Sequence, residues 1–142
     1  VLGPVDEPTS IHQAKFSMGT VLGLIAVYGK AGVREFDNYS LTCPEVKRFI
    51  AISSMYYDEE VDSAYPNQWI GRVSVQTANG KVFESEVPYP KGDPENTLSN
   101  DEIEEKFKDL ALYSNGLKED ELDMFIRFAK ELPYMESFKS FF

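Results

Sequence analysis

The segment 69–87, WIGRVSVQTANGKVFESEV, carries the strongest β signal in the chain. Val73 and Val75 alternate with polar residues, which is the two-residue period of a strand with one buried face. Asn79-Gly80 follows, a dipeptide that accommodates positive φ in a tight turn. Residues 82–87 then repeat the alternation as a return strand. The segment therefore predicts an antiparallel β-hairpin.

Helix signals follow the hairpin. Ser99 and Glu102 have the spacing of a capping box, in which each side chain satisfies an amide at the start of a helix. Asn115-Gly116 predicts the left-handed end of that helix. A last helix is expected over 118–132, because apolar residues recur there at helical spacing and Pro133 follows. The residues expected to face inward are Ile103, Phe107, Leu110 and Ala111 on the first helix and Leu122, Phe125, Ile126 and Ala129 on the second.

Helices are also predicted before the hairpin. Residues 13–28 are expected to form one helix that is apolar on almost every side and so needs cover on every side. Gly19 and Gly23 would let another backbone approach one flank closely. A short helix with proline at its first position is expected over 44–53. A short strand at 54–58 and an acidic connecting loop complete this part.

The order of these elements is typical of an α+β fold, without βαβ alternation. We expect a two-layer sandwich: a small antiparallel sheet of about three strands with helices on one face, plus C-terminal helices. Residues 1–12 are predicted to be an arm or linker, 13–116 an α+β domain, and 117–142 a C-terminal helical segment. A partner or another domain would cover the other face of the sheet.

Composition narrows the classes of function. The 142 residues are 42% hydrophobic and carry 14 Lys plus Arg against 24 Asp plus Glu, a net charge of −10. That surplus argues against nucleic acid or an anionic membrane as the main partner. The longest apolar run, 18–28, is about half of what a membrane-spanning helix needs. Cys43 alone permits no internal disulfide, which favours a reducing, cytoplasmic setting.

The inventory of catalytic residues is small. His12 is the single histidine, and it fits either an acid, base or ligand, or a surface histidine. Cys43 precedes Pro44 at a predicted helix start, a setting that activates some thiols, but the lack of a second histidine to act as its base favours an inert, partly buried cysteine. The sequence contains no GxSxG, P-loop, HExxH or dinucleotide fingerprint. The acidic residues at 58–62 lack the glycine and the ligand spacing of the common calcium loop, which favours a solvated loop.

Two segments combine charge with constraint. Lys15 and Ser17, in the sequence AKFS, place a cation and a hydroxyl near a helix start, where a carboxylate could bind. The alternative is a solvated lysine and a weak cap. The loop 91–96, KGDPEN, holds both signs of charge and precedes a well-capped helix, so it is expected to keep one shape. The residues assigned to this structural loop are Lys91, Gly92, Asp93, Pro94 and Asn96.

These segments together resemble a known family. Ala14-Lys15-Phe16-Ser17, which opens an apolar helix, resembles the A-x-F-S segment of the MmgE/PrpD family. Residues 90–99, PKGDPENTLS, resemble its P-x-G-D-P-x-N-P-L-S stretch, with Thr97 in place of a proline. Lys106-Phe107 followed by Leu110-Ala111 is similar to its K-F-x-x-L-A helix. The three matches occur in the family's order over residues 8–132.

The resemblance carries expectations about activity. The family includes 2-methylcitrate dehydratase, cis-aconitate decarboxylase and iminodisuccinate epimerase, and its members have a large helical domain and a smaller α+β lid with the pocket between them. This chain would be the lid, over 13–116, and a C-terminal return, over 117–142, that packs on the helical domain. The family's acid and base residues lie mainly in the helical domain, so no catalytic residue is assigned here. Lys15 and Ser17 are expected to bind substrate, and no metal or organic cofactor is implied.

The expected partners are a small di- or tricarboxylate substrate and an N-terminal helical domain absent from these residues. A homodimer is also compatible with the sequence. The chain alone is expected to be inactive. A detached binding or oligomerisation module is the alternative, and a small independent enzyme using His12 and Cys43 is a third.

Overall fold

The computed structural model describes residues 7–135, and the chain divides into two units, Val1–Ala64 and Tyr65–Phe142. The helices of the first unit are α1 (Ile11–Lys15), α2 (Met18–Tyr28), α3 (Asn38–Thr42), α4 (Pro44–Ile52) and α5 (Glu59–Ala64). The second unit contains β1 (Gly71–Gln76), β2 (Val82–Val87), the 3-10 turn η1 (Pro94–Asn96), α6 (Asn100–Tyr113), α7 (Glu119–Glu131) and the 3-10 turn η2 (Leu132–Tyr134). Helices and an antiparallel sheet confirm the predicted α+β class.

The helix expected over 13–28 is in fact two helices, α1 and α2, separated at Phe16 and Ser17. Ser10 caps α1 by accepting a hydrogen bond from the Gln13 amide, and Ser17 caps α2 by accepting one from the Thr20 amide. Serine favours such positions because its hydroxyl competes for backbone amides that a continuous helix would use. The single-helix prediction was therefore wrong at this serine.

Helix α2 packs against α4 through its glycines. A Cβ atom on Gly23 would lie 3.2 Å from the Val46 carbonyl oxygen and 3.3 Å from Val46 Cγ1. Val46 and Leu24 are fully buried. The close approach predicted from the glycine spacing is confirmed on this flank. On the other flank Ile25 keeps 45% of its surface exposed, so the first unit does not cover α2 on every side.

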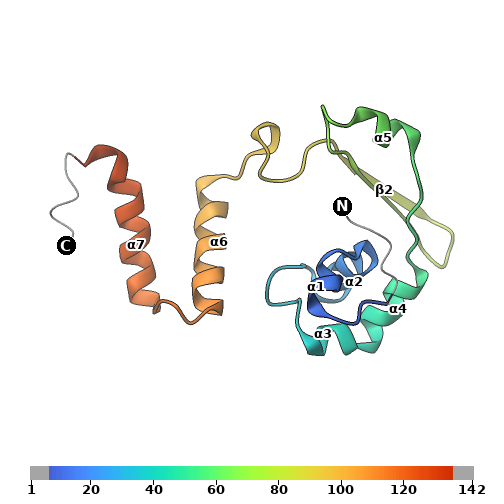
Figure 1. The fold of residues 1–142 in the computed structure, drawn as a ribbon, viewed down its shortest axis with the longest axis horizontal. Helices are drawn as coiled ribbons and strands as arrows, with labels where there is room; N and C mark the ends of the chain where they lie inside the picture. The colour runs from blue at the N-terminus through green and yellow to red at the C-terminus, as the bar shows by residue number, and fades with distance from the viewer. Residues whose placement is uncertain (1–6, 136–142) are drawn as a thin grey trace. The chain divides into compact units, whose positions relative to one another are not determined.

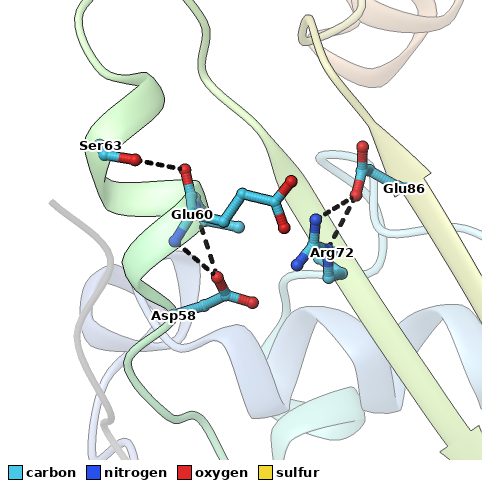
Figure 2. Close-up of polar contacts among 6 residues, drawn as sticks. Asp58, Glu60, Ser63, Arg72 and Glu86 are labelled. Atoms are coloured by element: carbon cyan, nitrogen blue, oxygen red, sulfur yellow. Dashed lines mark hydrogen bonds and ion pairs between the residues drawn. The ribbon is translucent and has the colours of Figure 1, made fainter.

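The predicted third strand at 54–58 does not form, and these residues are irregular. The acidic stretch expected to be a loop is instead the start of α5. Asp58 Oδ1 accepts hydrogen bonds from the amides of Glu60 at 3.0 Å and Val61 at 3.2 Å (Figure 2). Carboxylates in a first helical turn interact favourably with the free amides and the helix dipole, so the run of acids stabilises a helix start.

The predicted hairpin is confirmed, and within the described residues the sheet has two strands, fewer than expected (Figure 1). Gly80 takes φ +83° in the turn. Arg72 pairs with Glu86 across the strands, its Nη2 2.6 Å from Glu86 Oε2 (Figure 2). The opposite face carries Val75 beside Phe83, which remain 44% and 51% exposed. The hairpin is thus amphipathic, with an apolar face that is largely open.

Helices α6 and α7 lie side by side as a helical hairpin (Figure 1). Both hydrogen bonds of the predicted capping box are present, from the Ser99 amide to Glu102 Oε2 at 2.8 Å and from the Glu102 amide to Ser99 Oγ at 3.2 Å. Asn115 ends α6 near the predicted position, with φ +52°. Cross-helix ion pairs join Lys130 to Glu104 at 2.5 Å and Lys108 to Asp123 at 3.3 Å.

Part of the predicted inward face of this helical hairpin is exposed. Leu122 is 2% exposed and forms its buried centre. Ile103, Phe107 and Leu110, which recur at helical spacing on α6, keep 50%, 38% and 44% of their surface exposed. Phe125 on α7 is 39% exposed. The prediction that these four residues are covered is not met within the second unit. The C-terminal residues 136–142, part of the predicted helical segment, lie outside the described residues.

Candidate functional site

The two predicted substrate-binding residues lie at the junction of α1 and α2. Lys15 is the last residue of α1, and its side chain is exposed. Among residues 7–135 Lys15 has no ion-pair partner. Ser17, two positions on, is fully buried. The junction therefore presents the cation outward and directs the hydroxyl into the helix packing.

The Ser17 hydroxyl accepts the Thr20 amide at 3.2 Å, the hydrogen bond of a helix cap. Thr20 is also fully buried, and among the residues that the structure describes its Oγ1 has no hydrogen-bond partner. Burying a hydroxyl without a partner costs free energy, about 1–3 kcal/mol in proteins. Sequence reasoning missed Thr20, because a threonine inside an apolar helix gives no signal that distinguishes a buried hydroxyl from an exposed one.

His12 lies on the surface of α1. Its ring centroid is 5.1 Å from that of Phe16, one helical turn later, with the planes tilted by 57°. His12 and Phe16, four residues apart, thus make an aromatic contact at α1. No hydrogen bond links His12 to Cys43 in the described part of the chain. The structure gives the proposed His12–Cys43 enzyme no catalytic contact.

Cys43 is half-buried at the start of α4 and donates its thiol hydrogen to Glu45 Oε2 at 3.0 Å. This hydrogen bond lowers the pKa of Glu45, because it stabilises the carboxylate. A side-chain hydrogen bond with Cys43 also raises the pKa of Tyr28, whereas a side-chain hydrogen bond with Ser40 lowers it. Cys43 therefore acts as a hydrogen-bond donor to the Glu45 carboxylate, and within the described residues no histidine contacts the thiol as a base.

The loop assigned to Lys91, Gly92, Asp93, Pro94 and Asn96 is held by its own backbone. The Gly92 amide donates to the Asn96 carbonyl at 2.8 Å, and the Asn96 amide donates to the Asp93 carbonyl at 2.9 Å. Asn96 Nδ2 reaches the Tyr89 carbonyl at 2.9 Å. Gly92 takes φ +108°, a conformation that side chains rarely adopt.

An ion pair ties this loop to α6. Lys91 Nζ lies 3.0 Å from Glu102 Oε1, while Glu102 Oε2 caps the helix through the Ser99 amide. The Ser99 amide is the largest cause of the lowered pKa of Glu102, and Lys91 adds to it. One carboxylate thus closes the capping box and anchors the loop.

The described residues contain no group of three or more His, Cys, Asp or Glu side chains placed to hold a metal ion. Over the same residues, no helix has the length and apolar character required to cross a bilayer.

The chain belongs to the MmgE/PrpD family: the MmgE/PrpD C-terminal domain matches residues 1–129. No curated protein matches the chain. The matched range includes the AKFS segment, the hairpin, the KGDPEN loop and α6, so the family resemblance drawn from these motifs is confirmed.

Proposed function

We propose that this chain is the lid and C-terminal part of a cofactor-independent lyase of the MmgE/PrpD type, similar to 2-methylcitrate dehydratase. Its substrate would be a small di- or tricarboxylate, and the chain would be catalytically incomplete alone. The match of the family's C-terminal domain to residues 1–129 carries this proposal. A cytoplasmic setting belongs to the same proposal, since Cys43 is the single cysteine.

The small number of candidate acid and base residues supports a chain that supplies only part of the active site. Abstraction of a proton next to a carboxylate needs a positioned base and cations that hold the carboxylates. His12 is the single histidine, and its ring contacts Phe16 in a tilted arrangement at the surface of α1. The acid and base would then come from a helical domain, and this chain would contribute closure, water exclusion and a substrate contact.

Lys15 is the residue proposed to contact a substrate carboxylate, because its ammonium group is exposed and has no ion pair within residues 7–135. For Ser17 a structural role replaces substrate binding. Its hydroxyl is buried and caps α2, so it would position the junction that carries Lys15 without touching substrate.

Exposed apolar side chains support a domain that packs against another domain or subunit. Among the described residues, Ile52, Tyr56 and Tyr57 are 73–74% exposed, and the apolar faces of the β-hairpin and α6 are open as well. Apolar patches of this kind typically mark interfaces.

The test uses this chain assembled with a helical domain of the family. We expect Lys15→Gln to raise KM for 2-methylcitrate by about tenfold to hundredfold, since a hydrogen bond to a charged group contributes about 1.5–3 kcal/mol. Lys47→Gln is the matched control, because Lys47 is an exposed lysine of the same unit. Equal KM values for the two variants would contradict the role of Lys15. Parallel assays of cis-aconitate decarboxylation and iminodisuccinate epimerisation identify the reaction.

A detached binding or oligomerisation module is the second candidate, and the same open apolar surfaces favour it. Light scattering on the purified chain, together with activity measured after the helical domain is added, distinguishes the binding module from the lyase. A stable dimer that adds no activity when the helical domain is supplied would support the module. A monomer that gains activity with that domain would support the lyase.

A further inference from the structure

We draw no further inference here: the strongest candidate, the exposed apolar stripe that Ile103, Phe107 and Leu110 form on α6 of the helical hairpin, carries nothing because no feature of the described residues shows what covers it.

Discussion

A Cβ atom on Gly23 would lie 3.2 Å from the carbonyl oxygen of Val46, so the backbones of α2 and α4 meet through this glycine. Such contact is tighter than an ordinary van der Waals approach, and the atom opposite belongs to the backbone. A Cβ at Gly23 would therefore require the facing backbone of α4 to shift slightly. The packing of the first unit depends on this contact, since Val46 and Leu24 beside it are fully buried.

Gly23→Ala is expected to be less stable than Gly19→Ala by about 1–3 kcal/mol, because overpacking forces a backbone shift. Gly19 is a matched control: its Cβ would meet Ile50 Cγ2 at an ordinary 3.5 Å. Both substitutions replace a glycine of α2 by a better helix former, so a larger loss at Gly23 reports its packing. Urea unfolding followed by circular dichroism measures both variants. Equal free energies of unfolding would show that α4 does not approach Gly23 as described.

Glu102→Gln is expected to lower stability at pH 7, and the difference from the parent chain should shrink in acid. The pKa of Glu102 is lowered in the folded state from its ordinary 4.5. Its charge therefore stabilises the fold above pH 4.5, and this contribution is lost as the pH falls through the lower folded value. Glutamine keeps a capping oxygen but removes the ion pair with Lys91.

Urea midpoints at several pH values between 3 and 7 measure this effect. Glu105→Gln is the control, since Glu105 is an exposed carboxylate of the same helix. A Glu102→Gln difference that stays constant from pH 7 to pH 3 would refute the linkage.

Cys43→Ala is expected to raise the pKa of Glu45 toward its ordinary 4.5, because the thiol hydrogen bond is what mainly lowers it. Cys43→Ser should preserve the low value, since a hydroxyl also donates. Carboxyl resonances followed by NMR across an acid titration report the pKa directly. If the alanine and serine variants titrate together, the hydrogen bond is not the cause.

Chymotrypsin is expected to cut the folded chain after Tyr56 or Tyr57 before it cuts after Tyr113. The two tyrosines are 73–74% exposed in the irregular segment between α4 and α5, whereas Tyr113 lies in α6. Proteases need an extended backbone, which a helix supplies only after local unfolding. Mass spectrometry of early digestion products gives the order. Earlier cleavage at Tyr113 would contradict the helical assignment of its surroundings.

Local signals in the sequence predicted much of the secondary structure. The β-hairpin, the Ser99–Glu102 capping box and the end of α6 at Asn115 each depend on a few neighbouring residues, and each is confirmed. The secondary-structure predictions are wrong where a short polar side chain is compatible with two kinds of local structure. The sequence predicts Ser17 inside a helix, but Ser17 caps α2. It predicts Asp58 in a loop, but the Asp58 carboxylate accepts amides of the first turn of α5.

Burial was harder to predict than secondary structure. Helical periodicity identifies an apolar face, but it does not show whether this chain or another domain or subunit covers that face. Ile103 and Phe107 belong to the predicted face and are nevertheless exposed. For the candidate site, the sequence placed Lys15 and Ser17 together, but it gave no means to foresee that Ser17 is buried and Lys15 is not.

The central claim is that this chain forms one side of a cleft whose acid and base come from a helical domain. Turnover of 2-methylcitrate by the chain alone, by a family helical domain alone, and by the two together tests it most directly. We predict no dehydration by either part and measurable dehydration by the mixture. Dehydration by the 142-residue chain alone would contradict the account.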